Sequence, residues 1–178
     1  KTAYELRLSL VGSEMCISDR TPTGRIWESR SMDDGKTWAD PKPSALVHPD
    51  APPMVFHLSD DKTLIAFHHN RHINTQYVGL TGKMDGMRDR AEIWISLSKD
   101  GGRNWSEPQF LLTNVTRSNP AKNGWFNHNS SYMDAVIDGG TIHLFLPHLW
   151  NRALYMHLEE KDLAKLPTAK KLARRLPK

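Results

Sequence analysis

The sequence predicts an all-β fold made of about three antiparallel sheets, most of them four-stranded. Two observations support this prediction. Short β-rich runs alternate with turn signals along the chain, and one eight-residue turn motif occurs twice. The composition agrees, because 38% hydrophobic and 25% charged residues in a chain of 178 are typical of a globular domain with a real core.

The middle sheet is the clearest, and we assign it to residues 51–118. Its four expected strands are the runs "PMVFHL" (53–58), "TLIAFHHN" (63–70), "AEIWISLS" (91–98) and "SEPQFLLT" (106–113). In the third run, apolar Ile93 and Ile95 alternate with Trp94 and Ser96, as in a strand whose two faces differ. The polar stretch 71–90 is expected to be a long connection.

The same unit recurs on both sides of the middle sheet. Upstream, residues 1–50 contain β-rich runs at 4–10, 14–20, 25–31 and 39–47. Downstream, residues 119–166 repeat only the first three strands, at 131–137, 141–150 and 152–158. The last segment, 167–178, is a basic tail.

The tail has one apolar helical face, formed by Ala169, Leu172, Ala173 and Leu176. One interpretation is docking of this helix to an acidic partner or a membrane surface. The other, which we favour, is a short C-terminal helix that packs on the sheets and ends in solvent.

The repeated motif is "SMDDGKTW" at 31–38 and "SKDGGRNW" at 98–105. Its glycine allows the positive φ of a tight turn, and its aspartate can accept hydrogen bonds from the amides of the turn. Its serine completes the polar network, and its tryptophan is expected to fill the apolar space between neighbouring sheets. The shared residues are Ser31, Asp33, Gly35 and Trp38 in the first copy and Ser98, Asp100, Gly102 and Trp105 in the second.

This motif resembles the Asp-box, or BNR repeat, of the sialidase/neuraminidase-like superfamily, and residues 15–165 resemble consecutive repeats of that family. The resemblance implies a β-propeller, in which the motif lies between the third and fourth strands of each four-stranded blade. A sialidase propeller has six blades, and this chain supplies about half of them. An open half-propeller exposes two apolar sheet faces, so we predict that two copies associate to complete the ring.

The resemblance also implies a chemistry. Sialidases hold the carboxylate of the substrate with arginines, whose planar guanidinium group pairs with a carboxylate in bidentate fashion. The arginines expected on the loop face are Arg20, Arg71, Arg90 and Arg152. Tyr132 matches the nucleophile of the family, and Asp134 follows it on the same strand face.

The remaining acids leave two functions open. Glu14, Glu28 and Glu92 are possible partners of the nucleophile by spacing, but Glu28 and Glu92 are expected to be solvated. The first function is a sialidase-like glycoside hydrolase that acts on an acidic sugar or glycan. The alternative is a non-catalytic BNR-repeat module that binds glycan or protein.

The histidine-rich segment "HHNRH" (68–72) favours sugar binding over metal binding. His68 and His69 point to opposite faces of one strand, so they are poorly placed to bind the same ion. We expect His69 and Asn70, together with Trp125, to contact a sugar. No metal or other cofactor is predicted.

Charge and hydropathy argue against two kinds of partner, nucleic acid and a membrane that the chain would span. The formal charge is +4, but residues 168–178 hold five basic residues and no acid, which leaves the preceding body near −1. A near-neutral body argues against nucleic-acid binding. No apolar run is long enough for a membrane span. A lone cysteine, Cys16, does not decide between a cytoplasmic and a secreted location.

Overall fold

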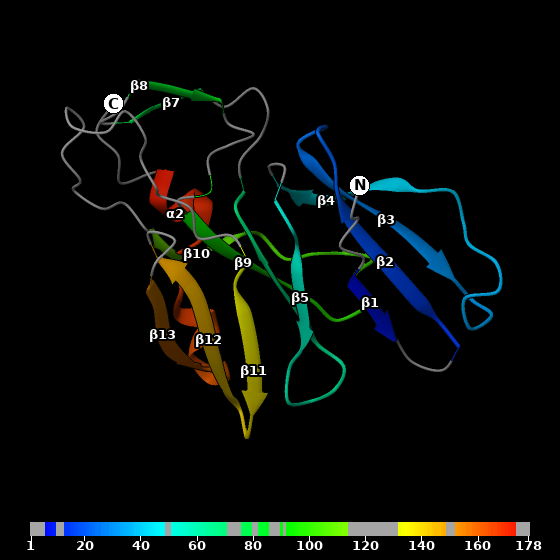
Figure 1. Ribbon diagram of the computed structural model, residues 1–178. Helices are drawn as coiled ribbons and strands as arrows, with labels where there is room; N and C mark the ends of the chain where they lie inside the picture. Colours follow the sequence, from blue (N-terminus) through cyan, green and yellow to red (C-terminus); the bar gives the residue numbers. More distant parts are fainter. Residues whose placement is uncertain are drawn as a thin grey trace.

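In the residues that it describes, the computed structural model contains three large antiparallel sheets and one separate two-stranded sheet (Figure 1). It describes residues 6–9, 13–48, 51–70, 76–79, 82–85, 90, 92–113, 132–148 and 152–173. The first sheet has the order β1 (Leu6–Ser9), β2 (Met15–Arg20), β3 (Arg25–Ser31) and β4 (Lys42–Val47). The second has the order β5 (Met54–His57), β6 (Leu64–His68), β9 (Glu92–Ser98) and β10 (Gln109–Thr113). The third has the order β11 (Asp134–Asp138), β12 (Thr141–His148) and β13 (Arg152–Glu159).

The first strands of the three sheets lie side by side. β1 contacts β5, and β5 contacts β11, so each sheet starts near a common centre and adds its later strands outward (Figure 1). Face-to-face sheets arranged in this way are consecutive blades of a β-propeller. The predicted fold class is therefore confirmed, and we call the three sheets blade 1, blade 2 and blade 3 in chain order.

The core consists of two apolar layers, one on each side of blade 2. β6 is buried along its whole length because both of its faces are covered. On one face, Leu64 and Ala66 pack with Ile26 of blade 1. On the other face, Phe67 packs with Ile142 of blade 3. A strand covered on both sides reads as a continuous apolar run, which is why "LIAF" stands out in the sequence.

The connection at 71–90 contains a short hairpin that the sequence analysis did not predict. β7 (Gln76–Gly79) pairs with β8 (Gly82–Asp85) in a separate two-stranded sheet. This segment shows little hydrophobic alternation, so the pattern that identified the other strands is weak here.

The chain after β13 returns to blade 2. It forms the 3₁₀ helix η1 (Glu160–Lys165) and the short α2 (Ala169–Ala173). Between them, the amide of Phe110 donates to the Pro167 carbonyl, and Thr168 bridges to Gln109, so this segment extends the outer edge of β10. The favoured interpretation of the tail, a C-terminal helix packed on the sheets, agrees with this arrangement. Position 176 of the predicted helix lies outside the described residues.

Within the part of the chain that the structure describes, no helix is long and apolar enough to cross a membrane.

Candidate functional site

The sheets have two edges with different chemistry. At the repeat edge, β3 and β9 end in the two repeated turns, and Glu14 of blade 1 binds Arg103 of blade 2 with a nitrogen–oxygen distance of 2.6 Å. At the opposite edge, β2 and β6 end, and His48 of blade 1 stacks on His69 of blade 2 with ring centroids 5.1 Å apart. We call this opposite edge the site edge, because the predicted functional residues fall on it.

The first repeated turn has the predicted hydrogen bonds. The Ser31 hydroxyl accepts from the amide of Gly35 at 2.8 Å and donates to Asp33 Oδ1 at 2.8 Å. Asp33 also accepts from the amide and the hydroxyl of Thr37, at 2.8 and 2.7 Å. Gly35 has a φ of 81°, which a residue with a side chain adopts only with strain.

The second turn repeats these contacts with asparagine in place of threonine. Ser98 accepts from the amide of Gly102 at 2.8 Å, and Asp100 accepts from the amide and the side chain of Asn104 at 2.9 and 2.7 Å. These hydrogen bonds from Asn104, with one from Ser98, lower the pKa of Asp100 to about 2. In both copies the serine hydroxyl and the aspartate carboxylate are hydrogen-bonded inside the turn, which indicates a structural role for these two residues.

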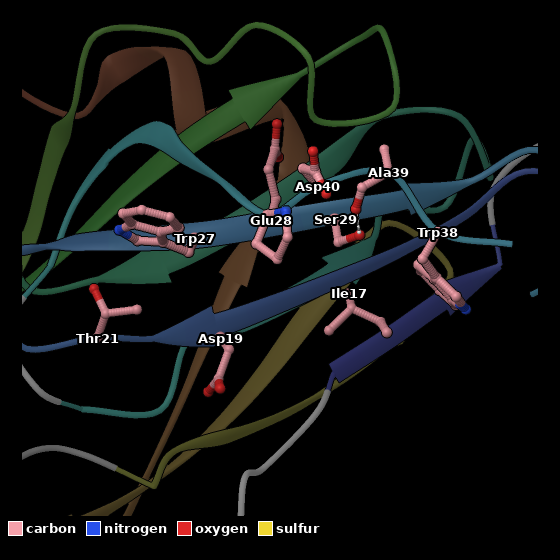
Figure 2. Close-up of a pocket in the computed structure, with 10 residues that line it drawn as sticks. Ile17, Asp19, Thr21, Trp27, Glu28, Ser29, Trp38, Ala39 and Asp40 are labelled. Atoms are coloured by element: carbon pink, nitrogen blue, oxygen red, sulfur yellow. Dashed lines mark hydrogen bonds between the residues drawn. The ribbon is translucent and has the colours of Figure 1, made fainter.

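The two tryptophans of the motif have different surroundings, which corrects the expectation that both fill space between sheets. Trp105 packs against the apolar layer between blades 1 and 2. Trp38 instead lines an open groove on the outer face of blade 1 (Figure 2). The difference arises because no described sheet covers that face of blade 1.

Each of the three blades has predicted functional residues at the site edge. Arg20 is the last residue of β2, Asn70 follows β6, and Arg90 precedes β9. Tyr132 precedes β11, the innermost strand of blade 3. Contacts between blades show that these ends lie along one edge. At this edge His48 of blade 1 stacks on His69 of blade 2, and at the opposite edge the Ser59 hydroxyl of blade 2 accepts from the amide of Gly140 in blade 3. Chain segments more than one hundred residues apart therefore supply one surface.

Two of these residues have a left-handed backbone. Tyr132 has a φ of 64° and Asn70 a φ of 49°. Asparagine tolerates this conformation, but for a bulky aromatic residue it costs of order 1–3 kcal/mol. Such strain concentrates at functional sites, where the surroundings hold a side chain in a required position. Tyr132 is 43% exposed, just before the first strand of blade 3.

Asp134 lies two residues beyond Tyr132 and is exposed. Its Oδ1 accepts a hydrogen bond from the amide of Ala135 at 2.8 Å. The carboxylate is thus held at the start of β11 and still faces solvent with its second oxygen.

The histidines form a buried cluster between blades 1 and 2. His68 bonds the Val47 carbonyl at 3.2 Å and the Ser96 hydroxyl at 3.0 Å, and its pKa falls to about 4 because burial disfavours the charged ring. His48 bonds the Ala51 carbonyl at 2.7 Å, and burial also holds its pKa well below the usual value.

His69 belongs to the same cluster. It is 1% exposed, and its Nδ1 lies 2.7 Å from the Glu92 carbonyl. The His69 ring is therefore part of the buried layer beneath the site edge. Asn70, the next residue, is partly exposed.

The three glutamates considered from spacing have separate positions. Glu28 was expected to be solvated, but it is 8% exposed and pairs with Arg30 at 3.5 Å, so that expectation is wrong. Glu14 lies at the repeat edge, 3.0 Å from Arg30. Glu92 alone of these begins its strand at the site edge, where its Oε2 accepts from Trp94 Nε1 at 3.0 Å.

For three predicted residues the structure does not describe the side chain. Arg71 and Trp125 lie outside the described residues. Arg152 begins β13 at the site edge, where it pairs with His148, but its side chain is outside what the structure describes. Among the described residues, no three His, Cys, Asp or Glu side chains are grouped so that they could hold a metal ion.

The fold defines the class of protein, a β-propeller of which this chain supplies about three blades. The particular family follows from the sequence comparison: residues 6–144 match the BNR repeat-like domain, and the chain belongs to this family. No curated protein matches the sequence.

Solved structures agree with the fold. A mutant of the GH43 protein BlXynB from Bacillus licheniformis superposes with a TM-score of 0.53 at 16% identity, over 88% of this chain and 28% of its own. The NanB sialidase from Streptococcus pneumoniae superposes with a TM-score of 0.54 at 16% identity, over 93% of this chain and 23% of its own. The chain thus spans about a quarter of the length of these proteins, and at this identity the likeness concerns the fold alone.

Proposed function

We propose that this chain contributes the site edge of a sialidase-like glycoside hydrolase that acts on an acidic sugar. The observation that carries the proposal is the meeting of Arg20, Arg90 and Tyr132 at one edge of three blades, opposite the structural turns. Membership of the BNR repeat-like family and a fold like that of a sialidase support the same class of substrate.

In this proposal the arginines bind the carboxylate of the sugar. Arg20 and Arg90 supply two guanidinium groups, and Arg71 and Arg152 are further candidates by chain position. A guanidinium group forms two parallel hydrogen bonds to a carboxylate, so it fixes both the charge and the orientation of the substrate. Neutral pyranosides lack this group and would bind more weakly.

Tyr132 is the proposed nucleophile. A phenol is neutral before attack, so it is not repelled by the carboxylate of the substrate. Its proton must pass to a base, and Glu92 is the carboxylate that begins a strand at the same edge. Asp134, exposed at the start of β11, is the proposed acid that protonates the leaving oxygen. Asn70 would bond a sugar hydroxyl.

The test is turnover of a panel of fluorogenic glycosides, sialosides included, by the 178-residue protein and by Tyr132→Phe. We expect sialoside turnover that falls at least about a hundredfold in the variant, because the phenyl ring cannot attack the sugar. Tyr155→Phe is the matched control: Tyr155 is 55% exposed on the outer face of blade 3, and turnover should be unchanged.

Arginine substitution separates binding from folding. Arg20→Ala and Arg90→Ala should each raise KM for a sialoside and leave the urea midpoint close to that of the parent protein. Lys99→Ala, which removes an exposed charge at the repeat edge, is the control for net charge. Equal effects of all three variants on KM would contradict a specific carboxylate site.

The alternative is a non-catalytic BNR-repeat module that binds glycan or protein. It rests on the same fold and repeated turns, which by themselves carry no chemistry. Calorimetric binding of a sialoside without turnover, lost in Arg20→Ala, would select this alternative.

A ligand site at a propeller axis requires blades on all sides of that axis. We propose self-association of two copies as one source of such blades, and a light-scattering mass of about twice 20.3 kDa would support it.

A further inference from the structure

The junction between blades 1 and 2 at the site edge is made by residues that directly follow two strands. His48 follows β4 of blade 1, and His69 follows β6 of blade 2. Both are 1% exposed, and their rings stack with an interplanar angle of 19°. The amide of His48 donates to the Gly24 carbonyl at 3.1 Å, so the backbone that carries this imidazole is held by blade 1.

The two hydrogen bonds of the His48 ring define which nitrogen carries its proton. Nε2 lies 2.7 Å from the Ala51 carbonyl, which can only accept, so Nε2 carries the hydrogen. Nδ1 lies 3.2 Å from the amide nitrogen of His69, which can only donate, so Nδ1 offers its lone pair. His48 is therefore neutral, with its proton on Nε2.

The amide that donates to His48 belongs to the segment that enters the site edge. Its acceptor comes from blade 1 and not from a neighbouring strand of blade 2. The next residue, Asn70, is the candidate sugar contact and has a φ of 49°. The His69 ring donates from Nδ1 to the carbonyl of Glu92, the first residue of β9. One imidazole of blade 1 thus holds the blade 2 backbone beside two residues of the proposed site.

The neighbouring His68 tolerates a second proton better than His48 does. Its Nδ1 donates to the Val47 carbonyl, and its Nε2 lies 3.0 Å from the Ser96 hydroxyl. A hydroxyl can rotate and accept when Nε2 becomes protonated, whereas a backbone amide can only donate. Protonation of His48 would place two donors against each other and break its contact with His69.

The surroundings of His48 favour the neutral ring. Burial, and then the charges of His69, His68 and Arg90, hold its pKa well below the usual value. On β9 the carboxylate of Glu92 accepts from Trp94 Nε1 at 3.0 Å. The charged residues near the same ends of β2 and β3 in blade 1 are Asp19, Arg20 and Arg25.

We propose that His48 is the positioning residue of the site edge: its neutral ring holds the blade 2 backbone that presents Asn70, and protonation releases that backbone. The consequence for ligand binding rests on the proposed function, whereas the consequence for the backbone does not. The site edge is then ordered at neutral pH and loosens in acid before the sheets unfold.

NMR of the unmodified 178-residue protein tests the contact without any variant that could fail to fold. At pH 7 the ¹⁵N shifts of the His48 ring should be those of a neutral imidazole protonated on Nε2. The protection of the His69 amide from hydrogen exchange should fall as the pH drops below 6.5, before that of the β12 amides does. A proton on Nδ1, or loss of protection in parallel with β12, would overturn the proposal.

Two substitutions separate the acceptor from the rest of the ring. Asparagine places its oxygen near the position of Nδ1 and does not titrate, whereas glutamine places its amide near the position of Nε2. His48→Asn should therefore keep the His69 amide protected at pH 7 and in acid. His48→Gln should lower its protection factor about tenfold at pH 7, with β12 unchanged. Equal protection in the parent and His48→Gln, or release in acid in His48→Asn, would contradict the proposal.

Sialoside kinetics at pH 7 link the contact to the site. His48→Gln should raise KM about fivefold, because the displaced Asn70 loses its hydrogen bond to the sugar, and His48→Asn should leave KM close to the parent value. Asn70→Ala should raise KM to a similar extent, and His48→Gln added to it should have little further effect. Absence of turnover would count against the proposed function alone, since amide exchange still decides the role of His48. Release of the amide without a change in KM would refute the link to the site.

Discussion

Trp38 and Trp105 occupy the same position in two copies of one turn, yet Trp105 alone packs between two described blades. The Nε1 of Trp38 donates to the Gly35 carbonyl at 3.0 Å, whereas the Nε1 of Trp105 is buried without an acceptor among the described residues. Apolar packing, and not the indole hydrogen bond, therefore holds Trp105 in place.

This difference predicts unequal stability effects. Trp105→Ala should lower the free energy of unfolding by about 3 kcal/mol, since it opens a cavity between blades 1 and 2. Trp38→Ala should lower it by about 1 kcal/mol in dilute protein, where the groove faces solvent. Urea unfolding followed by far-UV circular dichroism at the lowest usable concentration measures both. Equal losses would mean that the two tryptophans contribute equally to the free energy of unfolding, which would contradict the difference in their packing.

Gly102 and Gly140 provide a test of close packing with the backbone strain held similar. Both have positive φ, 82° and 85°, so alanine costs about 1–2 kcal/mol in strain at either position. At Gly102 an added Cβ would also lie 3.3 Å from the Trp105 ring and from the Arg30 guanidinium group, whereas nothing lies within 4 Å of one at Gly140. Gly102→Ala should therefore have the lower urea midpoint. A lower midpoint for Gly140→Ala would contradict the tight fit of the turn against blade 1.

Glu14 connects two blades through Arg30 and Arg103, at 3.0 and 2.6 Å. Burial raises the pKa of Glu14, but hydrogen bonds and charge from the two arginines outweigh burial and hold it below the model-peptide value of 4.5. Glu14→Gln should cost about 1–3 kcal/mol at pH 7, because it leaves the largely buried Arg30 with one fewer acceptor.

The pH dependence follows from the direction of that shift. Because the pKa of Glu14 is lower in the folded state, its stabilisation is present above pH 4.5 and is lost as the pH falls through the folded value. The difference in unfolding free energy between the parent and Glu14→Gln should shrink from pH 6 toward pH 3. A difference that does not change with pH would show that the charge of Glu14 is not what joins the blades.

The buried histidines predict that folding stability begins to fall at a higher pH than the loss caused by Glu14. The pKa of His68 falls from 6.5 to about 4, so the unfolded chain binds a proton there before the folded chain does. Stability should therefore decline as the pH falls below 6.5, by about 3 kcal/mol from His68 alone once the pH is below 4. The pKa of His48 shifts in the same direction, because burial first and then the charges of His69, His68 and Arg90 disfavour a protonated ring.

Substitution identifies the source of this slope. His68→Asn should flatten the dependence of unfolding free energy on pH between 7 and 4.5, even though it lowers stability at pH 7. Met32→Leu, which changes an exposed side chain without an ionisable group, should leave the slope unchanged. If both variants keep the parent slope, the acid sensitivity arises elsewhere.

Strand positions were largely predictable because they depend on local chemistry. The run at 141–150 became β12 (Thr141–His148), and the run at 91–98 became β9 (Glu92–Ser98). Turn residues and alternation act within a few positions of one another, so they can be read without knowing what lies across the sheet. The hairpin of β7 and β8 was missed because it lacks these local signals.

The candidate site was predictable only as a set of chain positions. Arg20, Arg90 and Tyr132 were recognised as residues next to strand ends, but the pairing of the strands decides that these ends share one edge. The strain at Tyr132 and the location of Glu92 beside His69 have no sequence signal.

The sequence by itself determined the two repeated turns, since the serine and the aspartate of each turn find their hydrogen-bond partners within eight consecutive residues. Tertiary structure decided which surfaces are covered. Glu28 was expected in solvent, but it is buried on the same face of β3 as Ile26 and pairs with Arg30. Hydrogen bonds inside a turn need only near neighbours, whereas burial depends on the sheet that arrives from elsewhere in the chain. For this reason Trp38 and Trp105, alike in sequence, differ in the structure.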